Sequence, residues 1–325
     1  MAAKGPIEHV VIVVQENHTF DNYFSGFPGA DGDLSLPVSP NPPPKDPDHR
    51  HAAWLNRATG ATRARFTEAM IPTYWDWARR YTLCQRYYTE VAGPSTPNHL
   101  MLIAAASPVI DNPPGAFGGH RPSFPMATLP GLLLKAGLTW ANYGGYAFEL
   151  IPETAARQLP SAQFATDAAA GRLATVSWLY APAGLDEHAP DTAAQRAAGH
   201  GNVTKGSEWV RAQVAAVVAG GLWNSTAIFV TWDDWGGWAD HVVPPELERW
   251  TDGTQFRLGS RVGCLVLSAY AKVGHLSSVQ TSHVSLVAFC EEQFGLPHLN
   301  AVDAAADPMS DCFDFTQPPL PPPPP

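Results

Sequence analysis

Continuous apolar runs rich in β-branched residues recur along the chain and limit how it can fold. The first spans residues 9–14 (His-Val-Val-Ile-Val-Val), similar runs follow at 174–179, 227–231 and 262–268, and a weaker one lies at 138–143. A run without polar alternation is typical of a strand that is buried on both faces, as the strands of a parallel sheet are.

Helical patterns fill the segments between these runs. The segments that fit a helix are 67–79, 98–105, 129–136, 203–219 and 282–293. The fourth ends at a pair of glycines, which is a common helix exit. Strands that alternate with helices predict an α/β fold with a mainly parallel central sheet and helices on both faces.

The composition supports a large core and argues against several classes of protein. Hydrophobic residues make up 45% of the 325 residues and charged residues 15%, which is ample apolar material for a core. No run approaches the roughly 18 apolar residues of a membrane-spanning helix. The net charge of −10 argues against a nucleic-acid-binding surface, whereas an anionic substrate stays open because a bound cation can reverse the local field. The oligomeric state is not indicated.

Polar clusters follow two of the apolar runs, at the strand ends where α/β sheets bind ligands. Glu16 and Asn17 come just after the first run, and Asp233 and Asp234 come just after the run 227–231. Carboxylate and amide oxygens are ligands of hard cations, and adjacent buried aspartates repel each other unless a cation lies between them. The clusters therefore indicate a divalent-metal site, although a polar turn is the simpler alternative for each one alone.

A third cluster carries a hydroxyl group. Ser95 follows the turn Gly93-Pro94 and precedes a predicted helix that has Pro97 near its start. A serine there is most often a helix cap, but the position also directs the positive end of the helix at an anion, which suits a nucleophile that attacks a phosphate. The chain has no G-x-S-x-G nucleophile elbow in this segment. Together the three clusters predict a metal site beside a hydroxyl nucleophile.

These residues resemble the bacterial phospholipase C and acid phosphatase family, whose motifs are shared by plant non-specific phospholipases C. The similar segments run in order along the chain at 7–24, 95–99, 187–190, 233–245 and 268–285. Three positions depart from the family pattern. His18-Thr19 stands in place of Arg-Ser, His99 replaces the commoner Arg, and Ser282 stands where an Asp often precedes His283.

The resemblance implies an alkaline phosphatase-like fold and hydrolysis of phosphate esters through a phosphoserine intermediate. It implies a metal held by Glu16, Asn17, Ser95, Asp233 and Asp234, with Ser95 also the nucleophile. Position in the matched motifs makes His188, His241 and His283 the candidate proton donors, and Asn98, His99, Glu187 and Asp240 the candidate substrate contacts. Asn98 has the alternative role of orienting its loop. Oxygen ligands favour Mg²⁺, Ca²⁺ or Mn²⁺, while zinc and iron stay open.

Proline is concentrated in two segments for which we expect opposite roles. Seven of the 32 prolines fall between residues 28 and 47, and seven more fall in the segment 318–325. We expect one catalytic domain over residues 1–317, with loop excursions at 28–52 and 106–127. The first proline-rich segment follows Glu16 and Asn17, so we expect it to form an ordered rim of the site. The second lies beyond the last matched motif and is expected to be a dispensable extended tail.

Three functions are weighed for such a chain. The first is an acid-phosphatase-like phosphomonoesterase with additional diesterase activity, which is preferred because the chain ends soon after its last matched motif and lacks a basic amphipathic helix for anionic lipid. The second is a phospholipase C that hydrolyses phospholipid head groups. The third is a non-catalytic protein whose proline-rich tail docks a partner with an aromatic groove.

The cellular location and the disulfide state are left open by the sequence. The apolar stretch at 10–14 is too short for a secretory signal and lacks a cleavage site, which leaves a cytoplasmic protein or a removed leader, whereas the resemblance implies a secreted or periplasmic one. The four cysteines include no Cys-x-x-Cys pair, so a zinc ribbon is not expected. A disulfide between Cys84 and another cysteine stays open.

Overall fold

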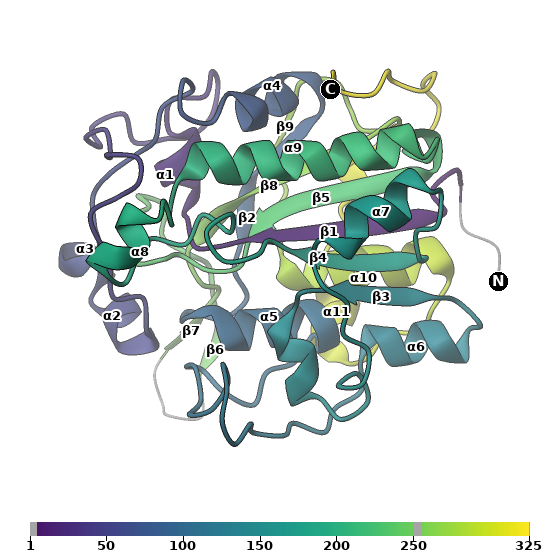
Figure 1. The fold of residues 1–325 in the computed structure, drawn as a ribbon, viewed down its shortest axis with the longest axis horizontal. Helices are drawn as coiled ribbons and strands as arrows, with labels where there is room; N and C mark the ends of the chain where they lie inside the picture. Colours follow the sequence, from purple (N-terminus) through teal and green to yellow (C-terminus); the bar gives the residue numbers. More distant parts are fainter. Residues whose placement is uncertain (1–4, 250–254, 325) are drawn as a thin grey trace.

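The computed structural model describes residues 5–249 and 255–324, and these form a central sheet covered by helices (Figure 1). The sheet has eight strands in the order β10-β2-β8-β5-β1-β4-β3, with β9 beside β2. The bounds of these strands are β1 (His9–Gln15), β2 (Thr82–Tyr88), β3 (Trp140–Tyr143), β4 (Val176–Tyr180), β5 (Thr226–Trp232), β8 (Arg261–Ser268), β9 (His275–Ser277) and β10 (Thr281–Ser282). A separate antiparallel pair consists of β6 (Glu246–Arg249) and β7 (Gln255–Arg257).

The predicted class of sheet is confirmed. Strands β3, β4, β1 and β5 are parallel neighbours, and β2 is parallel to β9 and β10. Strand β8 is antiparallel to β2 and β5 on either side of it, so the sheet is mainly but not wholly parallel. All five apolar runs form strands, whereas β2 was not predicted because Gln85 and Arg86 interrupt its apolar pattern.

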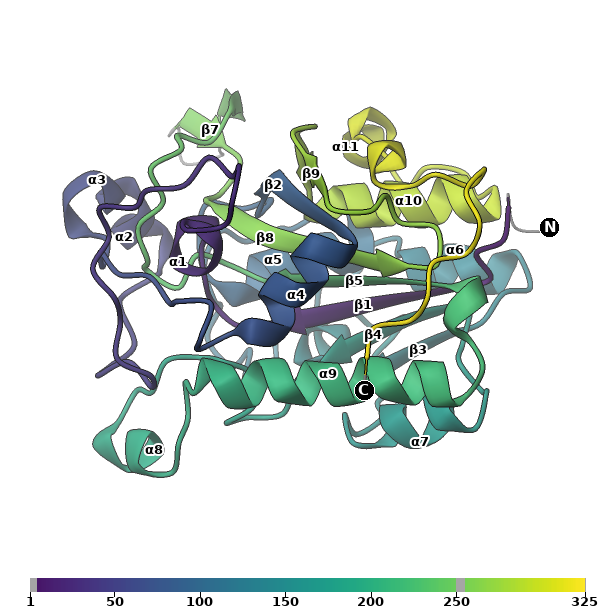
Figure 2. The same cartoon turned by 90° about the horizontal axis from the view of Figure 1, so that it is seen from above.

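Helices cover both faces of the sheet, as predicted. Figures 1 and 2 show α4, α7 and α9 on one face and α5, α6 and α10 on the other. The helix bounds are α1 (Phe20–Phe24), α2 (His51–Leu55), α3 (Arg57–Gly60), α4 (Pro72–Arg80), α5 (Ser95–Ala104), α6 (Leu129–Lys135), α7 (Gln163–Ala169), α8 (Ala193–Ala197), α9 (Val203–Ala219), α10 (His283–Phe294) and α11 (Ala301–Ala305). Short 3-10 turns are η1 (Tyr146–Leu150), η2 (Trp223–Ser225) and η3 (Ser310–Cys312).

The ends of two helices differ from the predicted ones because of proline. Helix α4 begins at Pro72 rather than at 67, since proline is favoured in the first turn of a helix and lacks the N–H that a later position needs. Helix α5 begins at Ser95, three residues earlier than predicted, and Pro97 is tolerated in its first turn. The earlier start makes Ser95 itself the first helical residue.

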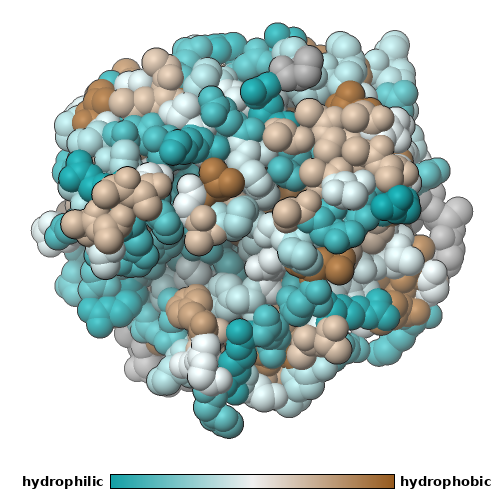
Figure 3. Space-filling view, viewed as in Figure 1, coloured by the Kyte–Doolittle hydropathy of each residue, from teal (hydrophilic) through white to brown (hydrophobic). Residues whose placement is uncertain are grey.

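The core lies between the sheet and its two helical layers. Residues Val10–Val14 of β1 are at most 1% exposed, and all residues of β5 are buried. On the surface, strongly apolar residues form only small separate patches on the face shown in Figure 3. Among the described residues, no helix combines the length and apolar character needed to cross a bilayer.

The two proline-rich segments both lie against the body of the protein. In the first, the Asp46 N–H donates to the Pro190 carbonyl at 2.9 Å. In the tail, the Leu320 carbonyl accepts from Trp223 Nε1 at 2.8 Å and the Pro321 carbonyl accepts from Tyr81 Oη at 2.8 Å. A tail held in this way does not support the alternative of a free proline-rich ligand. Its dispensability for activity stays a prediction.

The four cysteines are free and buried. The Sγ atoms of Cys84 and Cys312 lie 3.5 Å apart, which is longer than a disulfide bond of about 2.05 Å.

Close packing of α1 on β8 depends on one glycine of that strand. A Cβ atom added at Gly263 would lie 2.7 Å from Phe24 Cε2 and 2.8 Å from Trp232 Cζ3. Both rings are fully buried, so neither can move freely. We predict that Gly263→Ala lowers the free energy of unfolding by about 1–3 kcal/mol, as overpacked cores do. Urea unfolding of the purified variant measures this loss.

The matched control is Gly60→Ala, because no atom lies within 4 Å of a Cβ added at Gly60. We expect its stability to stay within about 0.5 kcal/mol of the wild type. Equal stability of the two variants would show that α1 does not require the close approach to β8.

Candidate metal centre and nucleophile

Two neighbouring parallel strands bring the predicted metal ligands together. Glu16 and Asn17 follow β1, and Asp233 and Asp234 follow β5, whose last residue is paired with the last residue of β1. The Asp233 N–H donates to the carbonyl of Gln15 at 3.0 Å, which fixes the two strand ends relative to each other. The convergence expected from the strand-end rule is therefore present.

Ser95 reaches this cluster from the start of α5. Its Oγ donates a 3.0 Å hydrogen bond to Asp234 Oδ2, and the side chain is buried. The other carboxylate oxygen of Asp234 accepts from the N–H of Gly236 at 2.7 Å. Gly236 has a positive φ of 58°, and a Cβ there would lie against the carbonyl oxygen of Asn17. This glycine is thus needed for the close approach of the two ligand loops.

The Asn17 amide faces two different sets of partners. One terminal atom lies 2.6 Å from Asp233 Oδ1 and 3.1 Å from Glu16 Oε2, and the other lies 3.3 Å from His188 Nε2 and 3.5 Å from His49 Nε2. A nitrogen beside the carboxylates donates hydrogen bonds to both of them, whereas an oxygen there completes an all-oxygen donor set for a cation. The residues present therefore fit a hard divalent metal ion.

The pKa values of the acidic groups in the cluster also indicate a site for a cation. Burial, together with the charge of Asp233, raises the pKa of Glu16 and of Asp234 well above their ordinary values. Burial also acts to raise the pKa of Asp233, but the hydrogen bond and charge of His99 outweigh it and lower that pKa. Asp233 and Asp234 are fully buried and Glu16 is partly buried beside them, so the three acidic groups are costly to ionise together without added positive charge.

His99, predicted as a substrate contact, lies among the carboxylates. Its Nε2 is 3.1 Å from Asp233 Oδ2 and 3.8 Å from Glu16 Oε1, close enough for the three residues to share an ion. Its ring lies between Tyr146 and Tyr180, and its Nδ1 is buried without a hydrogen-bond partner. His99 is therefore placed to adjust the charge of the cluster.

Two further residues of the site, Asp46 and His49, were missed by sequence reasoning. They lie in the predicted loop excursion 28–52, and with His188 they form a second group of converging ligand atoms. The Nδ1 atoms of His49 and His188 lie 2.9 Å from the Pro47 carbonyl and 2.7 Å from the Ala189 carbonyl, so both donate there and both Nε2 atoms face Asn17. The signal available in the sequence was the Asp-Pro-Asp-His segment at 46–49, which the high proline content obscured.

The pKa of His188 depends on the carboxylates that surround it. Burial by itself lowers the pKa of His188, but the carboxylates of Asp46 and Asp186 outweigh it and raise that pKa above the ordinary value. Of the three predicted proton donors, His188 is the one that the structure brings to the Asn17 amide.

The other two predicted proton donors have different surroundings. His283 is fully buried, and its ring nitrogens contact the Asp233 carbonyl at 2.7 Å and the Tyr87 hydroxyl at 3.0 Å. Burial lowers its pKa to about 4, so it is a neutral support beneath Asp233. His241 contacts Asp21 Oδ2 at 2.7 Å and Asp31 Oδ1 at 3.0 Å. The structure thus gives both histidines other partners and favours positioning roles over proton donation.

Asp240 and Glu187, both predicted as substrate contacts, are also occupied elsewhere. Asp240 is ion-paired with the buried guanidinium of Arg261 at 3.1 Å, in the network that includes Asp21. Glu187 is fully buried and accepts four hydrogen bonds, which come from Tyr23, Tyr74, Trp232 and Gln15. Burial raises the pKa of Glu187 to about 7. Neither carboxylate is free to meet a substrate.

Asn98 makes the contacts expected of its alternative role, which is to orient its loop. Its Oδ1 accepts from the Val91 N–H at 2.8 Å, and its Nδ2 lies within 3.1 Å of the carbonyls of Val91 and Pro94. The polar atoms of this side chain therefore hold the loop that leads to Ser95 rather than facing the cluster.

Comparison with known proteins identifies the family to which this chain belongs. The model of the Phosphoesterase family matches residues 45–297. The chain is 25% identical over 408 residues to the non-hemolytic phospholipase C of Pseudomonas aeruginosa. This alignment covers 96% of this chain and 58% of that protein. It is 25% identical over 419 residues to phospholipase C A of Mycobacterium tuberculosis, which covers 96% of this chain and 78% of that protein. The chain thus spans little more than half of the Pseudomonas relative.

Solved structures show the same fold at low sequence identity. An alkaline phosphatase superfamily protein from Vibrio parahaemolyticus has a TM-score of 0.54 at 11% identity, over 95% of this chain and 72% of that one. Murine ectonucleotide pyrophosphatase/phosphodiesterase 5 has a TM-score of 0.51 at 9% identity, over 90% of this chain and 96% of that one. The fold is that of the alkaline phosphatase superfamily, and by its sequence the chain belongs to the phosphoesterase family.

Proposed function

We propose that the chain is a metal-dependent phosphoric ester hydrolase that acts through a phosphoserine intermediate on Ser95. The observation that carries this proposal is the 3.0 Å hydrogen bond from Ser95 Oγ to Asp234, made at the first residue of a helix and beside a buried cluster of acidic groups. A solvated polar turn would leave these groups exposed to water, whereas Asp233, Asp234 and Ser95 are all buried.

The residues that would hold the metal are Glu16, Asn17, Ser95, Asp233 and Asp234. A bound divalent cation supplies Lewis acidity toward a phosphoryl oxygen and toward the serine hydroxyl. The oxygen-rich donor set favours Mg²⁺, Ca²⁺ or Mn²⁺. His99 adds a nitrogen donor within 4 Å of two carboxylates, which keeps zinc and iron as candidates.

The chain's own residues account for the attack. Asp234 accepts the Ser95 hydroxyl proton in its hydrogen bond, and Oγ forms a bond to phosphorus while the bond to the leaving alcohol breaks in line. The N-terminus of α5 contributes a favourable field for the anionic phosphate. Few backbone N–H groups in the first turn of α5 are free to contact the phosphate directly. Pro97 has no N–H, and the N–H of Thr96 donates to Asn112. Water then hydrolyses the phosphoserine.

We assign His188 as the donor of the proton that the leaving alcohol takes up. The ring of His49 lies beside that of His188. His188 Nδ1 is committed to a backbone carbonyl, which leaves Nε2 as the atom directed toward the cluster. A histidine in this place can hold a proton near neutral pH and deliver it to an oxygen. The first proline-rich segment supplies Asp46, and His49 follows it directly, which supports the expected role of this segment as the rim of the site.

Removal of the nucleophile should abolish turnover. We predict that Ser95→Ala lowers the rate of 4-nitrophenyl phosphate hydrolysis by about 1,000-fold or more, since no other hydroxyl replaces Oγ in the hydrogen bond to Asp234. The control is Ser310→Ala, a change at an exposed serine, which should leave the rate unchanged. Near-wild-type turnover by a folded Ser95→Ala protein would contradict the proposed mechanism.

The second candidate is a phospholipase C, which is favoured by the names of the curated relatives from Pseudomonas aeruginosa and Mycobacterium tuberculosis. The two candidates share the proposed chemistry and differ in the leaving group. A lipid surface calls for a sizeable exposed apolar area, whereas the residues at the rim, Asp46 and His49, are polar. We therefore place the phosphomonoesterase first.

A comparison of substrates separates these candidates. We expect 4-nitrophenyl phosphate to be hydrolysed faster than phosphatidylcholine in detergent micelles, because a soluble ester needs no docking to an interface. Release of the alcohol and of phosphocholine are measured on the same enzyme preparation, with Ser95→Ala as the blank for both. Faster release of phosphocholine would reverse the order and make the chain a phospholipase C.

A further inference from the structure

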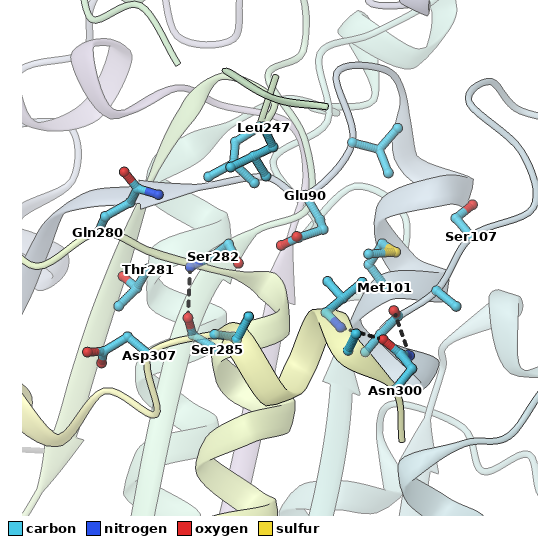
Figure 4. A pocket seen from close by; sticks show the side chains of 18 of the residues that line it. Glu90, Met101, Ser107, Leu247, Gln280, Thr281, Ser282, Ser285, Asn300 and Asp307 are labelled. Atoms are coloured by element: carbon cyan, nitrogen blue, oxygen red, sulfur yellow. Dashed lines mark hydrogen bonds between the residues drawn. The ribbon is translucent and has the colours of Figure 1, made fainter. Parts of the chain in front are cut away.

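A second cavity lies apart from the candidate metal centre and has a volume of about 860 Å³ (Figure 4). Its walls come from the end of α5, the start of α10, helix α11 and the strand β6. The residues that line it include neither the proposed metal ligands nor Ser95. Its volume falls in the range of small-molecule sites, about 300–1,000 Å³.

The walls of this cavity are largely apolar. Val91, Met101 and Leu258 are buried in its lining, and Leu247 is exposed at its edge. Helix α11 contributes Ala305, whose small side chain leaves the space open. Such walls fit a hydrocarbon chain rather than a sugar or a nucleotide.

One buried carboxylate lies in these apolar surroundings. Glu90 is only 4% exposed, and Figure 4 shows its carboxylate directed into the cavity, toward Ser282. It accepts a long hydrogen bond of 3.5 Å from the Val284 N–H, and the Ser282 side chain also forms a hydrogen bond with it. The other ionisable lining residues, Glu246 and Asp307, are also acidic, and among the described lining residues there is no lysine, arginine or histidine. The carboxylate of Glu90 therefore gives its part of the cavity a charge complementary to a cation.

The wall of the cavity also contains a hydroxyl group without a hydrogen-bond partner. Thr281 lines the cavity and is 3% exposed, yet its Oγ1 has no hydrogen-bond partner. A buried polar atom without a partner is costly, by about 1–3 kcal/mol, so this hydroxyl is an unsatisfied polar group in the wall of the cavity. Thr281 and Glu90 lie on separate segments that meet at the same cavity.

We propose that this cavity binds a small amphiphile with an ammonium head group and a hydrocarbon tail. The head group pairs with Glu90, and the tail lies along Val91, Met101 and Leu258. The site is distinct from the proposed phosphoester centre, so it adds a ligand to the protein rather than a detail to hydrolysis.

The test is isothermal titration of the full chain with three probes of equal chain length, namely octylammonium, octanol and octanoate, at pH 7. We expect octylammonium to bind at least about tenfold more tightly than octanoate, because a charge-assisted contact with Glu90 is gained by one and lost by the other. In Glu90→Gln this preference should fall to about twofold or less. Equal affinity of the wild type for octylammonium and octanoate would overturn the proposal.

A second pair of variants keeps the test valid if Glu90→Gln does not fold. Ala305→Trp fills the cavity and should abolish binding of all three probes, while its hydrolysis of 4-nitrophenyl phosphate stays unchanged. Ala304→Trp is the matched control, because Ala304 is an exposed α11 residue outside the lining and should bind as the wild type does. Wild-type affinity for octylammonium in Ala305→Trp would place binding elsewhere and contradict the proposal. Loss of hydrolysis by Ser95→Ala is read separately and tests the phosphoester centre alone.

Discussion

Repulsion between the carboxylates that crowd together at the ends of β1 and β5 is the constraint on which the site depends. The parallel pairing of these strands forces Glu16, Asp233 and Asp234 into one place. Among the described residues, His99 is the one partner that forms an ion pair with them. The fold therefore brings together negative charge that its own side chains do not neutralise, and a divalent cation with an anionic substrate beyond it is the simplest chemical complement.

In a second group of buried carboxylates, an arginine side chain of the protein itself compensates the negative charge. Asp21 and Asp240 share the guanidinium of Arg261, which lies 3.1 Å from each. In a buried ion pair of this kind, each charge is compensated by its partner, and removal of one partner leaves an uncompensated charge in the interior. Asp233 and Asp240 are seven residues apart in one motif-like segment, yet one faces the cluster and the other faces an arginine. The contrast separates a site for a bound ion from an internal ion pair.

The fold was predictable because a continuous apolar run indicates a buried strand whatever its neighbours are. The partners of a polar side chain, in contrast, are residues distant in sequence. The runs at 9–14 and 227–231 became neighbouring strands, and that alone placed the four ligands that follow them. His241 and Glu187 could not be assigned in this way, because Asp21 and the tyrosines that hold them are known only from the folded chain. His49 was missed for the converse reason, since a segment without periodicity gives no indication of which surface it covers.

The central claim is that the buried carboxylate cluster is a cation site, and its most direct test is the thermal unfolding midpoint of chelator-treated protein before and after addition of Mn²⁺ or Mg²⁺. Binding at 100 times the dissociation constant stabilises the folded state by about 2.7 kcal/mol, so we expect the midpoint to rise by about 5 °C. The rise should be lost in Asp233→Asn and kept in Asp76→Asn, a change in an exposed pair with Arg80. No rise in the wild type with any divalent ion, or an equal rise in Asp233→Asn, would contradict the account.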